Sequence, residues 1–95
     1  PLTAFLNDLG ADSLIVTGTT TSGCVRASVI DAFSQNLRVT IAEEGCFDRS
    51  QASHAINLCD MNAKYADVVS TEEALAYVDT IEAEYNLPSG EPLNG

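Results

Sequence analysis

An alternation of short apolar runs with helical periodicity is the feature that most constrains how this chain can fold. The apolar runs cover residues 13–18, 37–43 and 67–70. Apolar residues at helical spacing fill the segments around them, including 23–36 and 51–66. Strands that alternate with helices are joined by right-handed crossovers and pair in parallel. We therefore predict an α/β fold in the order α-β-α-β-α-β-α, with helices flanking a parallel sheet.

Two local patterns describe the ends of this arrangement. The run SLIVTG at 13–18 is continuously apolar between turn signals, which is typical of a strand buried on both faces. Ser70 and Glu73 form an S-x-x-E capping box, so a helix is expected to begin after Ser70. Its apolar face is expected to carry Ala74, Val78, Ile81 and Tyr85.

The sheet that these strands can form is only half of a doubly wound sheet. The chain also opens inside a helical pattern, because Pro1 suits the first helical position and no capping residue precedes it. We therefore expect residues 1–87 to be the C-terminal half of a larger domain, whose upstream half is missing or lies in a separate chain. Residues 88–95 are rich in turn formers and are expected to be a flexible tail.

Charge and cysteine content narrow the class of protein. The formal net charge is −10, from 14 acidic and 4 basic residues, which disfavours nucleic acid and anionic membranes as partners. Three cysteines without a C-x-x-C motif favour a reducing cytoplasm over a disulfide framework. The spacing of Cys46, His54 and Cys59 fits no zinc motif, so no metal is expected.

The segment 51–66 carries two apolar stripes. One stripe consists of Ala52, Ala55, Ile56, Cys59 and Ala63; the other consists of Leu58, Met61 and Tyr65, with His54 at its head. One stripe would face the sheet, and the second needs another cover. A subunit interface of a homo-oligomer and an exposed stripe on a monomer both satisfy this pattern.

Cys24 lies between the first strand and the helix that follows it. Ligands of open α/β sheets gather at the carboxyl ends of the strands. A helix N-terminus there favours a thiolate, and its free N–H groups can hold an oxyanion. The small residues TTTSG before Cys24 let a substrate approach the backbone. Position alone leaves open a nucleophilic thiol and a buried, inert one.

The other candidate residues have weaker patterns. Cys59 lies in an apolar stripe and is predicted to be in the core, whereas Cys46 can line a pocket but has no activating neighbour. His54 has no carboxylate placed to orient it, which favours a surface or interface histidine over a general base.

Arg49 leaves the second strand at the same sheet edge as Cys24. Its guanidinium can bind a substrate carboxylate with two hydrogen bonds. It can equally pair with Asp48, Glu43 or Glu44, and the pattern alone favours that salt bridge.

Two longer segments resemble a known family. GTTTSGCVRASVIDAF, residues 18–33, resembles the nucleophile segment of the isochorismatase-like cysteine hydrolases. DRSQASHAINLCDMNAKYADVVS, residues 48–70, resembles the N-carbamoylsarcosine amidohydrolase branch, and the maleamate amidohydrolases share much of it. The resemblance runs from about Pro1 to Val78. It implies the C-terminal half of a Rossmann-like, isochorismatase-type sheet.

The resemblance also implies roles for individual residues. Cys24 falls on the nucleophile, which attacks a terminal amide or ureido carbonyl and expels ammonia. A cis peptide is implied between Thr19 and Thr20, with the amides of Thr20 and Cys24 forming the oxyanion hole. Arg49 falls on the arginine that holds a substrate carboxylate, and Thr21 sits where it can assist. No cofactor and no metal are implied.

The family's triad also needs an aspartate and a lysine that have no counterpart in this chain. The resemblance therefore implies that the missing half supplies them, and that this chain alone is nearly inactive. A substrate of the maleamate, nicotinamide or isochorismate type remains an alternative. So does a catalytically incomplete fragment that acts only as an assembly subunit.

Overall fold

The computed structural model describes residues 2–81, 85–86 and 91–92. Its first half contains α1 (Leu2–Asp8), β1 (Ser13–Thr19), the π-helical turn η1 (Thr21–Val25), α2 (Arg26–Ser34) and β2 (Arg38–Phe47). Its second half contains α3 (Gln51–Lys64), β3 (Asp67–Val69), α4 (Thr71–Asp79), β4 (Tyr85–Asn86) and β5 (Glu91–Pro92). The predicted order of helices and strands is confirmed from α1 to α4, with η1 as an additional turn before α2.

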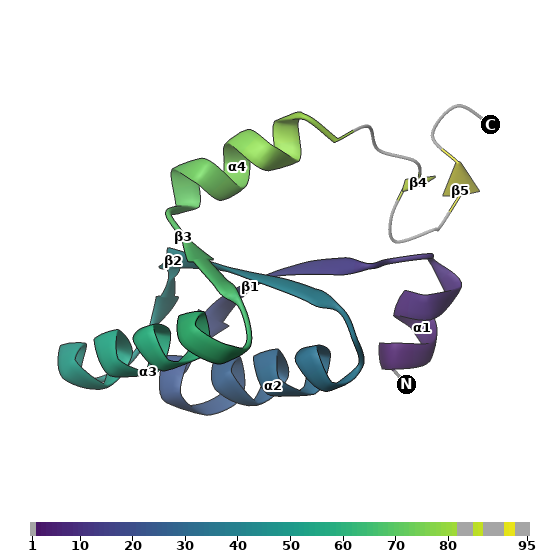
Figure 1. The fold of residues 1–95 in the computed structure, drawn as a ribbon. Helices are drawn as coiled ribbons and strands as arrows, with labels where there is room; N and C mark the ends of the chain where they lie inside the picture. The colour runs from purple at the N-terminus through teal and green to yellow at the C-terminus, as the bar shows by residue number, and fades with distance from the viewer. Residues whose placement is uncertain (1, 82–84, 87–90, 93–95) are drawn as a thin grey trace.

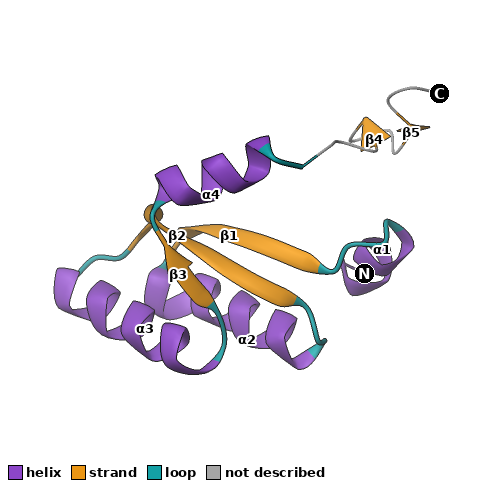
Figure 2. Ribbon diagram, turned by 45° about the horizontal axis from the view of Figure 1, so that its top comes forward, coloured by secondary structure: helices purple, strands orange, loops and turns teal. Residues whose placement is uncertain are grey.

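The three main strands form a parallel sheet in the order β1-β2-β3 (Figure 1). Helices α2 and α3 lie together on one face of the sheet, and α4 lies over the opposite face (Figure 2). Helices on both faces are what a parallel, doubly wound sheet requires. The predicted α/β fold is therefore confirmed.

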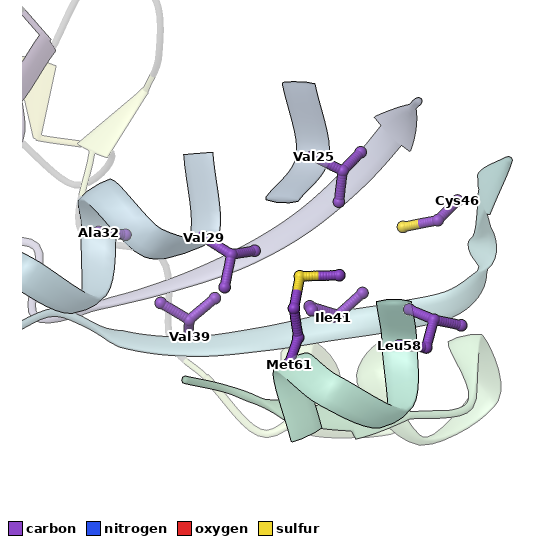
Figure 3. Packing of buried hydrophobic residues seen from close by; sticks show 8 residues of the cluster. All are labelled: Val25, Val29, Ala32, Val39, Ile41, Cys46, Leu58 and Met61. Carbon is purple, nitrogen blue, oxygen red and sulfur yellow. The ribbon is translucent and has the colours of Figure 1, made fainter. Parts of the chain in front are cut away.

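The core lies between the sheet and the α2–α3 layer. Val29 of α2, Ile41 of β2 and Met61 of α3 are each 0% exposed and meet from three elements (Figure 3). The rest of the buried cluster consists of Val25, Ala32, Val39, Cys46 and Leu58. Burying one such aliphatic or Met side chain stabilises the fold by roughly 1.5–3 kcal/mol.

Strand β1 differs from its prediction as a strand buried on both faces. Its residues alternate between exposed and half-buried, and Ile15 is 41% exposed. Among the described residues β1 pairs only with β2, so it is an edge strand. Apolar composition indicated a buried strand, but burial also depends on neighbours that a run of six residues does not specify.

One apolar stripe of α3 is buried and the other is exposed. Leu58 and Met61 face the sheet and are buried, whereas Ile56 is 68% exposed. The prediction of Cys59 as a core residue is wrong: its side chain is exposed, because it belongs to the stripe that faces away from the sheet. The stripe that needs another cover is therefore the one that contains Ile56.

Serine side chains fix where the last two helices begin. Ser50 Oγ accepts a hydrogen bond from the Ser53 amide at 3.3 Å, and Ser70 Oγ accepts one from the Glu73 amide at 3.1 Å. The predicted cap of α4 is thus confirmed. The tail predicted at 88–95 falls outside the described residues except for residues 91–92, which pair with β4. No helix in the described parts of the chain is long and apolar enough to span a bilayer.

Candidate active site

The turn after β1 presents Cys24 to the outside. Gly23 leaves helical geometry, with φ −114° and ψ −107°, so η1 is kinked. The Thr20 carbonyl accepts from the Gly23 amide at 2.9 Å and from the Val25 amide at 3.1 Å, which closes a wide turn around the cysteine. The Cys24 side chain is exposed. The alternative of a buried thiol is therefore wrong, and the nucleophilic role of Cys24 stays a prediction.

The backbone before the cysteine has a distinctive geometry. The peptide bond between Thr19 and Thr20 is cis. Within residues 2–81, the Thr20 amide has no hydrogen-bond acceptor. An N–H group without an acceptor in this part of the chain, four residues before an exposed thiol, can donate to a bound oxygen atom.

Thr21 anchors the turn to α3. It is 0% exposed, and its Oγ1 lies 2.8 Å from His54 Nδ1. Its hydroxyl is therefore engaged by α3 in the described structure and does not lie on the open side of the loop. His54, expected at a surface or interface, is half-buried and holds this loop. The contact joins residues 33 positions apart, which no local pattern signals.

Asp48 links the cysteine turn to the end of β2. Its Oδ2 accepts from the Ser22 amide at 2.9 Å, and its Oδ1 accepts from the Arg49 amide at 2.7 Å. The Ser53 hydroxyl lies 3.4 Å from Oδ2. The side-chain hydrogen bond with Ser22 is the main cause that holds the pKa of Asp48 below its ordinary value, with smaller contributions from both amides and Ser53. The sequence offered Asp48 only as a partner for the Arg49 guanidinium.

The Arg49 side chain is exposed. Within residues 2–81 its guanidinium forms no ion pair, so the salt bridge that the pattern alone favoured is absent there. The Asp48 carboxylate is taken by backbone amides, and Glu44 accepts from the Thr71 amide at 2.6 Å. That backbone hydrogen bond with Thr71 is the main cause of a lowered pKa at Glu44. Among the described residues, no carboxylate therefore competes with an external anion for the Arg49 guanidinium.

An irregularity in β2 brings Asp48 and Arg49 to this place. Val16 pairs with Ile41 and Gly18 with Cys46, so two steps along β1 correspond to five along β2. Extra residues in one strand bend it and are frequent beside functional sites. The strand was predicted to end at residue 43 because the bulge breaks its apolar pattern. Cys46 lies beyond the bulge, buried, and burial raises the pKa of its thiol.

The structure thus brings Cys24, Thr20 and Arg49 to the carboxyl edge of β1 and β2, with Asp48 between the two loops. No side chain in the described part of the chain forms a hydrogen bond with the Cys24 thiol. No group of three His, Cys, Asp or Glu side chains there can hold a metal ion.

The fold and this loop define the class of protein. Residues 1–73 match the family model described as "Isochorismatase domain", and the chain belongs to the isochorismatase family. It is 38% identical to maleamate amidohydrolase of Pseudomonas putida over 74 residues, 78% of this chain and 35% of that protein. It is 40% identical to N-carbamoylsarcosine amidase of an Arthrobacter species over 80 residues, 84% of this chain and 30% of that protein. The chain spans about a third of the length of these curated relatives.

Solved structures agree with this assignment. A putative hydrolase of the isochorismatase family from Chromobacterium violaceum superposes with a TM-score of 0.78 at 32% identity, over 84% of this chain and 47% of that one. An isochorismatase-like hydrolase from Alkaliphilus metalliredigens gives a TM-score of 0.77 at 23% identity, over 81% and 42% of the two chains. The second likeness concerns the fold alone.

Proposed function

We propose that the natural protein carrying this sequence is a cysteine-dependent amidohydrolase that releases ammonia from a small carboxylic acid of the N-carbamoylsarcosine type. The exposed thiol of Cys24 in the turn after β1, four residues after a Thr20 amide that has no acceptor within residues 2–81, is the observation that carries the proposal. The names of both curated relatives, an amidohydrolase and an amidase, support it.

The reaction begins when Cys24 Sγ bonds to the carbonyl carbon of a terminal amide or ureido group. The amides of Thr20 and Cys24 stabilise the oxyanion of the tetrahedral intermediate. The carbon–nitrogen bond then breaks, and the nitrogen leaves as ammonia after it takes up the proton that the thiol gave up. Water hydrolyses the resulting intermediate, a thiocarbamate from a ureido group or a thioester from an amide, and restores the thiol.

Arg49 binds the carboxylate of the substrate in this proposal. Its guanidinium has no ion-pair partner within residues 2–81, and it follows Asp48, which contacts the cysteine turn. A planar guanidinium can donate two parallel hydrogen bonds to a carboxylate. Thr21 assists substrate binding indirectly, because its contact with His54 holds the nucleophile turn in place.

The residues that move the thiol proton belong to a part of the protein that this chain does not supply. We propose that the upstream half contributes the aspartate and the lysine of the family's triad, and that the chain alone is nearly inactive. Removing members of a cooperative catalytic unit lowers the rate by about 10³–10⁶. We further propose a homo-oligomer in which another subunit covers the exposed stripe of α3, and a reaction that needs neither metal nor cofactor.

Ammonia release by the natural protein tests the function. N-Carbamoylsarcosine, maleamate and nicotinamide are compared, with Cys24→Ala as the inactive variant and Cys59→Ala as a matched control, since Cys59 is exposed on the outer stripe of α3. Preference for N-carbamoylsarcosine supports the proposal, and preference for maleamate makes the protein an enzyme of the maleamate amidohydrolase kind. Activity that survives Cys24→Ala, or no release from any substrate, rejects the amidohydrolase and leaves an assembly subunit.

A further inference from the structure

We propose that Asp48 is a positioning residue that fixes the nucleophile turn and Arg49 relative to each other. The inference rests on the proposed function of Cys24 and Arg49, and it adds a residue that touches neither the substrate nor the reacting atoms. Its basis is one carboxylate shared by two backbone amides, one on each of the loops that carry these two side chains.

Each carboxylate oxygen has its own task. Oδ2 accepts from the Ser22 amide, two residues before Cys24, and Oδ1 accepts from the Arg49 amide itself. Ser22 and Arg49 are exposed, and within residues 2–81 neither amide has another acceptor. The Asp48 side chain therefore bridges the backbone of the loop after β1 to the backbone of the loop after β2.

An ionised carboxylate suits this position. One N–H group approaches each of its oxygens, and a carboxylate offers acceptors alone. An asparagine offers one acceptor and one NH₂ group, which would face the second amide as donor against donor. The lowered pKa of Asp48 is consistent with a charged group held by donors. Glutamate retains both oxygens but moves them by one methylene group.

The nucleophile turn is also attached to α3, and this attachment separates positioning from simple stability. Thr21 is fixed to α3 through His54, so the turn stays attached to the fold when Asp48 is changed. Asp48→Asn is therefore expected to shift Ser22 and Arg49 while the buried core, which lacks Asp48, stays intact.

Kinetics of the natural protein test the inference. Asp48→Asn is expected to lower kcat/KM about 10- to 100-fold, the loss that corresponds to a charged hydrogen bond. Displacement of Arg49 raises KM, and displacement of the turn lowers kcat. Asp48→Glu should restore part of both. Asp31→Asn is the matched control, since Asp31 is exposed and its side chain forms no hydrogen bond within residues 2–81.

Alkylation by iodoacetamide gives a readout independent of substrate. In Asp48→Asn the alkylation rate at Cys24 should change several-fold relative to Cys24 of the wild-type protein, measured in parallel under the same conditions. A variant with wild-type kcat, KM and Cys24 alkylation overturns the inference. A fall in folding stability with unchanged kinetics in the folded fraction also overturns it, because Asp48 would then be merely structural.

Amide hydrogen exchange of the wild-type protein keeps the inference testable when Asp48→Asn does not fold. Ser22 and Arg49 amides should exchange at least about tenfold more slowly than unbonded amides of exposed residues. Exchange of both at the unbonded rate refutes the bridge. The proposed function is refuted separately, if the wild-type protein releases no ammonia or if Cys24→Ala still releases it. The hydrogen-exchange result for the Asp48 bridge does not depend on either outcome.

Discussion

Gly45 lies in the irregular part of β2, where an added methyl group would meet β1. A Cβ atom at this position would stand 2.9 Å from Thr17 Cγ2, 3.3 Å from Thr17 Cβ and 3.3 Å from the Ala42 carbonyl oxygen. Ordinary carbon–carbon contacts lie near 3.5–4.0 Å. Gly45→Ala therefore forces the two strands apart by about half an ångström or forces Thr17 out of its rotamer.

The expected cost is that of overpacking one methyl group, about 1–3 kcal/mol of unfolding free energy. Urea denaturation measures it as a lower midpoint at unchanged slope. Thr17→Ser removes the closest atom, Cγ2, and leaves two contacts of 3.3 Å. The double variant should therefore recover about half of the loss, a coupling in the range found for touching residues.

Two results would refute this reasoning. Gly45→Ala with wild-type stability would mean that Thr17, which is exposed, turns aside without penalty. Equal losses in the single and double variants would place the cost elsewhere than in the Thr17 contact. A lower kcat/KM in Gly45→Ala at temperatures where it remains folded would further show that the bulge sets the place of Asp48 and Arg49.

The remaining predictions concern the core, pH and assembly. Met61→Ala should lower the unfolding free energy by about 2–5 kcal/mol, because Met61 is 0% exposed; a loss below 1 kcal/mol in urea would contradict this core. The pKa values of Asp48, Asp60 and Glu44 are lowered in the folded state, chiefly by hydrogen bonds with Ser22, Arg26 and Thr71. Their stabilisation is present above the ordinary carboxyl range, about pH 4, and is lost as pH falls through the folded values, so urea midpoints should drop there and stay level above it. Ile56→Lys should shift sedimentation toward smaller species without changing monomer stability, since Ile56 is 68% exposed; an unchanged assembly state would exclude α3 as the interface.

The sequence predicts the elements of this fold better than the contacts between them. Helical spacing and the Ser70 cap are local, and α4 begins after Ser70 as expected. The parallel sheet follows from alternation of strands and helices. Burial of β1 was overestimated, because apolar composition does not say which neighbours cover a strand. The prediction of Cys59 in the core is wrong for a similar reason, since α3 has two apolar stripes and only one of them can pack on the sheet.

The candidate site divides in the same way. Cys24 is a candidate from the sequence because a thiol after a strand and before a helix is a local pattern, and its catalytic role stays a prediction. Asp48 and His54 were missed as supports of the loop because their partners lie 26 and 33 positions away. Between the pairs Val16–Ile41 and Gly18–Cys46, β2 contains three more residues than β1, and this irregularity brings the segments together. Gly45 is the residue in it that signals a close approach of the two strands.

The segment from Asp48 to His54 therefore supports the candidate site through its contacts with the nucleophile turn. It begins where the bulged strand ends, and it contacts two consecutive residues of the nucleophile turn, Ser22 through Asp48 and Thr21 through His54. It also carries Arg49. An enzyme that must hold a small substrate between a thiol and a guanidinium needs their separation fixed to a fraction of an ångström. We propose that Asp48 and His54, which bind backbone and hydroxyl groups of the nucleophile turn, set this separation, so variants remote from the reacting atoms should alter kcat and KM together.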